Sequence, residues 1–211
     1  KRLHVLTGDI TKKKLGLSKK DTAELNKVIT DIIHAAAITR FDLDIDSIRK
    51  INVEGTKNVL EFSKQCVNLK QLVFISTPYI SGKRTGKIFE NDRVHNSGFV
   101  NTYEQSKYEA EALVESASDK LPIVIYRLST IIGDSKTGKV THFTAPHLSL
   151  RIMYLGLAAM VPGTPDYSID LVPSDYAAKT IFALYTRHFK SKQVFHIVGG
   201  LKKSYKLQEL I

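Results

Sequence analysis

The sequence predicts an α/β fold in which a parallel sheet is covered on both faces by helices. Short, strongly apolar segments, typical of strands buried in a parallel sheet, recur along the chain. Stretches with apolar residues at helical spacing lie between them, and this alternation is the pattern of strand–helix–strand units. With 43% hydrophobic and 25% charged residues in 211, the chain is one globular domain, or one domain with a lobe, and not a disordered or collagen-like chain.

The first third of the chain predicts a strand, a helix, a second strand and a second helix. Residues 3–6 alternate weakly and stop at a turn, and residues 21–30 form a polar helical stretch. Residues 28–37 end in an apolar run that predicts a buried strand. Residues 46–66 predict one amphipathic helix. Glycine at position 55, inside this helix, destabilises it by about 1 kcal/mol relative to alanine. We therefore expect Gly55 to be present because another segment packs closely against the helix there.

The middle of the chain predicts a buried strand, a loop and the best-defined helix. Residues 72–75 are the strand, and residues 79–100, which contain Gly, Ser and Asn, are the loop. The helix spans residues 102–118, with Asn101 as its N-cap and Glu104 placed to complete the cap.

The last third predicts two further strands, at residues 122–126 and 194–198. Between them, residues 140–165 mix apolar, His and Pro residues, as a loop-and-helix cover over a pocket does. Residues 170–184 return to the main body, with Pro173 in the first turn of a helix.

The charge balance and the histidine positions narrow the classes of function that the sequence supports. The 31 Lys and Arg exceed the 21 Asp and Glu, but the lysines are scattered among loops without interleaved aromatic residues. We therefore expect a solvated surface, or attraction to a phosphorylated cofactor or an acidic partner, rather than nucleic-acid binding. His142 and His147 have no Cys or carboxylate partner at ligand spacing, so no metal site is predicted.

The expected location is the cytoplasm. Cys66 is the only cysteine, which excludes an intrachain disulfide and favours a reducing compartment. The apolar runs are shorter than the ~20 residues needed to cross a bilayer. The first residues lead directly into the strand pattern and do not resemble a secretory signal.

A tyrosine and a lysine on the best-defined helix could carry redox chemistry. Tyr103 and Lys107 are four residues apart, so their side chains share one helix face. A nearby ammonium lowers the pKa of a phenol, which ordinarily lies near ~10, and makes it a usable acid for a carbonyl oxygen that receives hydride. Tyr79 and Lys83 have the same spacing, but they lie in a loop that does not hold them on one face.

Hydroxyl groups after a buried strand support this interpretation. Ligands of parallel sheets bind beyond the carboxyl ends of the strands. Ser76 and Thr77 follow the strand at residues 72–75 and lie 26 residues or more before Tyr103. A hydroxyl there can donate a hydrogen bond to the same carbonyl oxygen, although Thr77 is equally placed to act as a turn residue before Pro78.

A set of motifs that covers nearly the whole chain resembles a known family. The segments are residues 8–10, 34–37, 51–56, 75–77, 103–107, 127–133 and 172–176. In this order they resemble the extended, atypical short-chain dehydrogenase/reductases. Residues 106–111 and 133–138 make the chain most similar to the thioester-reductase and fatty acyl-CoA reductase branch, with its male-sterility-type NAD-binding domains. That branch includes the terminal reductases of nonribosomal peptide synthetases.

The resemblance implies roles for individual residues. Thr77 would polarise the substrate carbonyl, Tyr103 would donate the proton, and Lys107 would hold the nicotinamide ribose and lower the tyrosine pKa. Asn52 would support the helix or a water near Lys107, and Asp9 with its neighbour would meet the adenine edge. The implied NAD(P)-binding positions are Asp9, Ile10, Ala35, Ala36, Ala37, Asn52, Ser76, Tyr103, Lys107, Leu128 and Ile131. From the residues alone, Asp9 could equally close a turn, the alanines pack the core and Asn52 cap locally.

Two departures from the family pattern affect the cofactor site. Leu128 stands where the family usually has a proline after the arginine, and this difference affects the shape expected for the nicotinamide pocket. The family's opening Gly-x-x-Gly-x-x-Gly turn, whose amides bind the pyrophosphate, does not occur in the 211 residues. The chain resembles the family from its third strand onward, so we expect the first two strands to be missing from this sequence. The residue that distinguishes NADH from NADPH is missing with them.

The resemblance therefore implies an NAD(P)H-dependent reductase that transfers hydride to an acyl thioester, bound to phosphopantetheine or CoA, and releases an aldehyde or alcohol. A carrier protein is the expected partner. Residues 1–138 would be a Rossmann-type NAD(P)-binding core, and residues 139–211 a substrate lobe whose segment of about 166–199 returns to the core. The alternatives are a sugar-nucleotide epimerase or dehydratase, a sterol-type alcohol dehydrogenase, and a non-catalytic regulator that senses dinucleotide.

Overall fold

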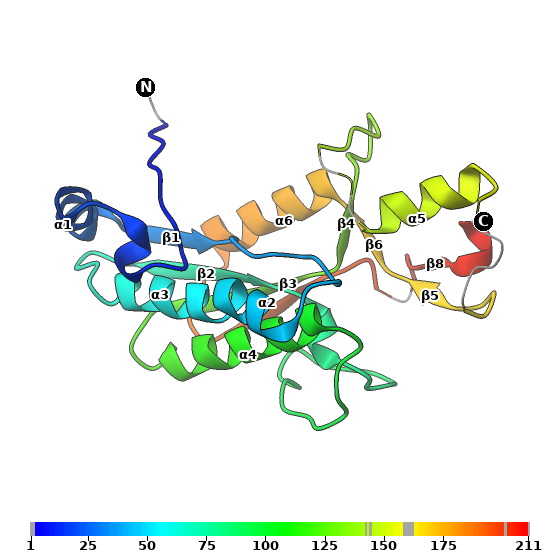
Figure 1. Ribbon diagram of the computed structural model, residues 1–211, viewed down its shortest axis with the longest axis horizontal. Helices are drawn as coiled ribbons and strands as arrows, with labels where there is room; N and C mark the ends of the chain where they lie inside the picture. The colour runs from blue at the N-terminus through cyan, green and yellow to red at the C-terminus, as the bar shows by residue number, and fades with distance from the viewer. Residues whose placement is uncertain (1–2, 142, 144, 158–162, 201, 211) are drawn as a thin grey trace. The chain divides into compact units, whose positions relative to one another are not determined.

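The computed structural model describes residues 3–141, 143, 145–157, 163–200 and 202–210 (Figure 1). The chain divides into two compact units, described separately below. The first comprises Lys1–Arg127 and His188–Phe195, and the second Leu128–Arg187 and His196–Ile211. The prediction for His142 lies outside the described residues.

The first unit is built on a parallel sheet. The strand order is β1 (Asp31–His34), β2 (Gln71–Ser76), β3 (Ile123–Leu128), β7 (Val194–Ile197), with β1 at one edge. β1 runs parallel to β2, and β2 parallel to β3. Only the first two residues of β7 belong to this unit. The prediction of a parallel α/β fold is confirmed.

Helices α2 (Ile45–Asn52), α3 (Glu54–Ser63) and α4 (Thr102–Ala117) lie along the same face of this sheet (Figure 1). The other helical elements of the unit are η1 (Lys13–Gly16), α1 (Lys19–Val28) and η2 (Pro78–Ser81). The core joins α3 and α4 to β2 and β3, and its most buried members are Leu72, Phe74, Ala110, Val114 and Ile123. Each large side chain buried in this way contributes about 1.5–3 kcal/mol.

Two predictions for the first unit are wrong. Residues 3–6 form no strand, and Leu3 and Val5 are 78% and 86% exposed. A strand requires a partner, and alternation in the sequence does not show whether one is present. The helix predicted over residues 46–66 is two helices, α2 and α3, interrupted at Val53.

Gly55 has the packing role that the sequence predicted. The side chain of Ile10 lies so close to α3 that a Cβ on Gly55 would be 2.8 Å from Ile10 Cδ1. The Asn58 side chain donates a hydrogen bond to the Ile10 carbonyl at 2.8 Å. The loop after the exposed N-terminal segment is therefore fixed on α3.

The second unit contains two small sheets. β4 (Thr130–Ile132) pairs in parallel with β6 (Leu171–Pro173), and β5 (Ser168–Ile169) pairs antiparallel with β8 (Tyr205–Lys206). Its helical elements are α5 (Ala145–Tyr154), α6 (Ser174–Arg187) and η3 (Leu207–Glu209). α6 begins directly after Pro173, so the helix predicted within residues 170–184 starts only after β6 ends.

Within the described ranges, no helix combines the length and the apolar character that crossing a bilayer requires.

Candidate active site

The candidate site lies at the carboxyl ends of β1 and β2, beside the first two turns of α4. The Asn101 side chain accepts a hydrogen bond from the Glu104 amide at 2.9 Å, and the Glu104 carboxylate accepts one from the Val100 amide at 2.9 Å. This reciprocal cap fixes where α4 begins. It thereby fixes the face on which Tyr103 and Lys107 lie.

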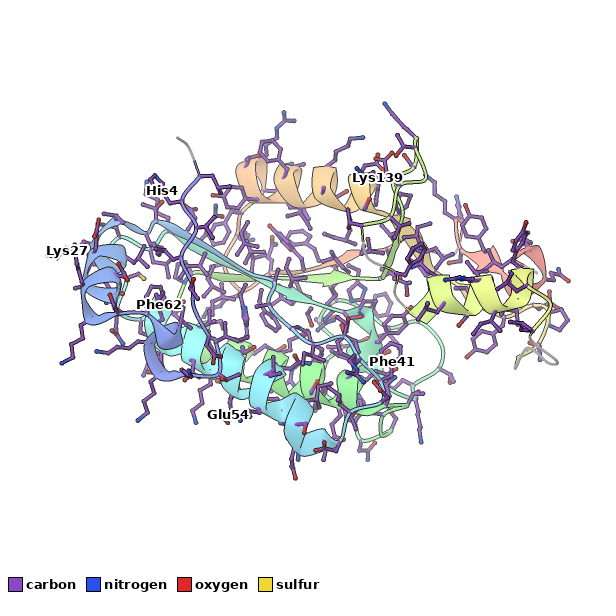
Figure 2. The ribbon with its side chains drawn as sticks, turned by 45° about the horizontal axis from the view of Figure 1, so that its top comes forward. His4, Lys27, Phe41, Glu54, Phe62 and Lys139 are labelled. Atoms are coloured by element: carbon purple, nitrogen blue, oxygen red, sulfur yellow. The ribbon has the colours of Figure 1, made fainter. Side chains whose placement is uncertain are left out.

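Tyr103 is half-buried, and its ring centroid lies 5.7 Å from that of Phe41. Phe41 belongs to the loop after β1 (Figure 2). Burial raises the pKa of Tyr103 to about 12, nearby Tyr79 adds to the rise, and a hydrogen bond from Thr77 opposes it. The expected lowering of the phenol pKa by Lys107 is thus wrong for the chain alone, because desolvation dominates. A phenol with this pKa keeps its proton at neutral pH and can donate it.

Lys107 is 4% exposed and points toward β2. Its Nζ donates a hydrogen bond to the Ile75 carbonyl at 2.8 Å and lies 4.3 Å from the centroid of the Phe74 ring. Burial lowers the pKa of Lys107 to about 8, and the charge of Glu111 acts in the opposite direction. One of three ammonium donors is used by Ile75, which leaves two for a ligand.

Thr77 follows β2 directly and is 3% exposed. Its hydroxyl oxygen accepts a hydrogen bond from the Tyr79 amide at 3.3 Å, which caps η2, and its hydroxyl is hydrogen-bonded to Tyr103. The structure therefore brings together two of the three residues predicted to be catalytic. Both the turn role and the candidate catalytic role of Thr77 are compatible with these contacts.

Ser76 and Asn52 are engaged in buried hydrogen bonds. The Ser76 hydroxyl donates to Glu111 Oε2 at 2.5 Å. The side-chain oxygen of Asn52 accepts a hydrogen bond from the backbone amide of Ile38 at 2.8 Å. The side-chain nitrogen of Asn52 donates to the Ile38 carbonyl and to Ser106 Oγ. Asn52 therefore ties the loop after β1 to the first turns of α4.

The remaining predicted cofactor residues differ in position. Ala35 and Ala36 are exposed at the carboxyl end of β1, and Ala37 is half-buried. The Asp9 carboxylate accepts hydrogen bonds from the amide and the hydroxyl of Thr11, at 2.9 and 2.7 Å. These bonds lower the pKa of Asp9 and close a turn. Leu128 and Ile131 are half-buried residues of the second unit.

His34 is a buried polar residue beside the site that sequence reasoning did not select. It is 5% exposed, and its Nε2 lies 3.0 Å from Thr56 Oγ1. Because Thr56 donates its hydroxyl proton to the Asn52 carbonyl, Nε2 must be the donor to Thr56. Burial and the charge of Lys107 lower the pKa of His34 to about 4, so the ring is neutral.

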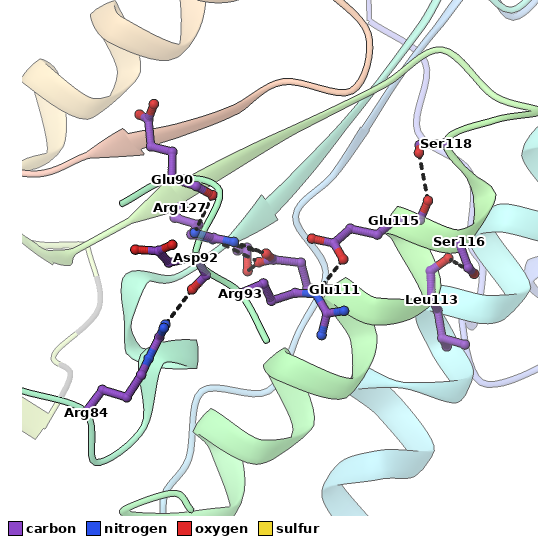
Figure 3. A network of polar contacts seen from close by, with 11 residues as sticks. Arg84, Glu90, Asp92, Arg93, Glu111, Leu113, Glu115, Ser116, Ser118 and Arg127 are labelled. Carbon is purple, nitrogen blue, oxygen red and sulfur yellow. Dashed lines mark hydrogen bonds and ion pairs between the residues drawn. The ribbon is translucent and has the colours of Figure 1, made fainter. Parts of the chain in front are cut away.

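Glu111 and Arg127 are two further buried residues to which the sequence analysis assigned no role. They form an ion pair with side chains 0% and 1% exposed (Figure 3). The signals were present: Glu111 is four residues after Lys107 on the same helix, and Arg127 is a charged residue in an apolar strand.

The model of one protein family, described as male sterility protein, matches residues 1–181. Among curated proteins, fatty acyl-CoA reductase wat of Drosophila melanogaster is 26% identical over 210 residues, covering 86% of this chain and 41% of that protein. The non-canonical nonribosomal peptide synthetase cpsA of Aspergillus campestris is 30% identical over 215 residues, covering 95% of this chain and 20% of that protein.

Solved structures that resemble this chain include a terminal domain of a peptide synthetase pathway, in agreement with the curated relatives. The terminal R domain from the myxalamid PKS-NRPS pathway superposes with a TM-score of 0.85 at 31% identity, over 96% of this chain and 50% of that one. UDP-glucuronic acid 4-epimerase from Bacillus cereus, solved with NAD, superposes with a TM-score of 0.71 at 23% identity, over 92% of this chain and 60% of that one, which shows the shared fold alone. The chain spans less than half the length of the two curated relatives and half of the myxalamid R domain.

Proposed function

The chain belongs to the male sterility protein family, and on that basis we propose that it forms part of an NAD(P)H-dependent reductase of acyl thioesters. Its relatives include a fatty acyl-CoA reductase, a nonribosomal peptide synthetase and a terminal R domain. The observation that carries the proposal is the hydrogen-bonded pair of Thr77 and Tyr103 beyond the end of β2.

The residues present fit the nicotinamide end of the cofactor. Ala35 and Ala36 leave the end of β1 open to the approach of a flat ring. Lys107 keeps two donors for ribose hydroxyls. No Gly-x-x-Gly-x-x-Gly turn occurs in the 211 residues, so no residue of this sequence is assigned to the pyrophosphate. When bound, the reduced nicotinamide supplies a hydride.

The residues of this chain would act on the carbonyl oxygen of the thioester. Thr77 and Tyr103 would both donate hydrogen bonds to it, in a largely buried site where such bonds are strong. Tyr103 holds its proton at neutral pH and transfers it as negative charge develops on the oxygen. The carbonyl carbon gains the hydride, the oxygen gains the proton, and the carbon–sulfur bond then breaks to give an aldehyde and a thiol.

We further propose that the thioester is carried on phosphopantetheine or CoA and that residues 139–211, apart from the segment of about 166–199 that returns to the core, form the lobe that receives the acyl group. The comparison with a thiolation-reductase di-domain, at 25% identity and a TM-score of 0.68, supports a carrier-protein partner. The single cysteine supports a cytoplasmic location.

The test replaces Tyr103 by Phe in the protein that carries this chain. Loss of the proton donor is expected to reduce thioester-dependent NADPH oxidation at least about 100-fold. Tyr108→Phe is the matched control, since Tyr108 lies on the same helix and packs against Phe99 and His95. Equal loss in both variants, or none in Tyr103→Phe with the fold intact, would contradict the assignment. Activity of the wild type on UDP- or dTDP-sugars instead of acyl-CoA would point to the epimerase or dehydratase alternative.

A further inference from the structure

An almost completely buried ion pair joins α4 to β3 in the core of the first unit. Glu111 Oε1 accepts from Arg127 Nε at 3.0 Å and from Arg127 Nη2 (Figure 3). Arg127 Nη1 also donates to the Glu90 carbonyl at 3.0 Å. Buried ion pairs are weak stabilising devices, because the loss of hydration offsets the attraction between the charges. A pair buried so completely beside a candidate site therefore calls for a further role.

The second oxygen of Glu111 links the pair to the site. Glu111 Oε2 accepts the hydroxyl of Ser76 at 2.5 Å, while Lys107, one turn earlier on α4, donates to the carbonyl of Ile75 at 2.8 Å. α4 therefore holds the last two residues of β2 by two side chains that lie one helical turn apart. The next residue along the chain is Thr77, whose hydroxyl is hydrogen-bonded to Tyr103.

We propose that Glu111, held in place by Arg127, is a positioning residue of the active site: it fixes the end of β2 against α4 and keeps Lys107 in the ammonium form. This inference rests on the proposed reductase function. Glu111 touches neither substrate nor cofactor in this assignment. It acts through Ser76 and Lys107.

The charged groups around Lys107 identify Glu111 as the one that favours the ammonium. On α4, Glu111 raises the pKa of Lys107 against the effect of burial, and Tyr103 keeps its proton. From β1, His34 is neutral. From β3, Arg127 is ion-paired with Glu111. Removal of the Glu111 carboxylate is therefore expected to lower the pKa of Lys107 below its value of about 8.

The experiment uses Glu111→Gln, which keeps an amide oxygen for Ser76 but removes the charge. The Lys107 side chain is titrated by NMR in the cofactor-free protein with lysine labelled at Cε, and kcat/KM for an acyl-CoA is measured against pH. Both the Lys107 pKa and the alkaline limb of the profile are expected to fall by about one pH unit. Because the active form carries the ammonium, activity is then lost at a lower pH than in the wild type.

Glu115→Gln is the matched control. Glu115 lies one turn further along α4 and forms an ion pair with Arg93, whose Nε is 2.5 Å from Glu115 Oε2 (Figure 3). This variant also removes a carboxylate and breaks an ion pair on the same helix. Its Lys107 pKa and pH profile are expected to match the wild type, and a shift equal to that of Glu111→Gln would overturn the inference.

The double variant Glu111→Leu/Arg127→Met separates positioning from stability. An apolar pair of similar size often restores the stability that a buried ion pair provides. The inference expects a folded protein in which the Lys107 pKa is still lowered and kcat is reduced. A double variant with a wild-type pH profile and kcat would show that the pair only fills the core. The wild type could also prove inactive on acyl-CoA while the Lys107 pKa still falls by the expected amount in Glu111→Gln. That result would contradict the proposed function but leave the electrostatic role of Glu111 intact.

Discussion

At the scale of one residue, the burial of Tyr103 governs its acid–base chemistry by raising the pKa of its phenol to about 12. Its spacing from Lys107 on a capped helix was readable from the sequence, and the helix was confirmed. The direction of its pKa shift was not readable, because desolvation depends on the packing of Phe41 and the end of β2 around the ring. The burial of Tyr103 favours the protonated form of its phenol at neutral pH.

Thr77→Val provides a test at this scale, since valine has nearly the same shape but no hydroxyl. The hydrogen bond that opposes the rise in the Tyr103 pKa disappears, and so does one donor to the substrate oxygen. We expect kcat to fall about 100-fold with little change in KM for the cofactor. Thr77→Ser restores the hydroxyl and is expected to recover most of the activity; a serine variant as impaired as the valine variant would argue against the role.

At the scale of elements, the caps and the core helices were the most predictable features. Asn101 and Glu104 form the predicted reciprocal cap, and α4 has bounds within a residue of the prediction. Residues 3–6 were mispredicted because their alternating pattern carries no information about a partner strand. The break at Val53 was missed because the apolar spacing continues across it.

The cap of α4 can be tested by Asn101→Ala. Loss of the side-chain acceptor leaves the Glu104 amide without its bond, which is expected to lower the free energy of unfolding by about 1 kcal/mol. Chemical denaturation measures this change. Asn101→Asp also caps helices well and is expected to restore stability, whereas an alanine variant as stable as the wild type would show that the Glu104 side chain alone holds this end of the helix.

At the scale of the whole molecule, the buried polar groups make the stability depend on pH. The pKa of His34 is about 4 in the folded chain, against 6.5 for an ordinary histidine. Between these values the unfolded chain binds the proton and the folded chain does not, so stability falls as the pH falls through this window. The full effect is on the order of 3 kcal/mol.

His34→Gln tests this dependence because its amide can still donate to Thr56 without binding a proton. The difference in unfolding free energy between wild type and variant is expected to shrink or reverse as the pH is lowered from 7 toward 4 in thermal or urea unfolding. His4→Gln, which replaces an exposed histidine, is the control. A difference that stays constant across this range would exclude His34 as the source.

The fold class was the most accessible feature of the whole molecule, because alternating apolar strands and amphipathic helices leave few arrangements other than a parallel sheet. The buried contacts of His34 with Thr56 and of Glu111 with Arg127 were not accessible, since each joins two elements whose packing against each other the sequence does not show. Charged residues in apolar segments were the available signal.

The position of β1 at the edge of the sheet has a consequence for handling the isolated chain. Among the described residues no strand lies beyond β1, and Ile33 on it is 52% exposed. The outer rim of such a strand offers backbone groups to any extended segment of another molecule. Concentrated solutions of this polypeptide should therefore be prone to intermolecular pairing and precipitation, and a protective charge introduced at Ile33 is the natural engineering remedy.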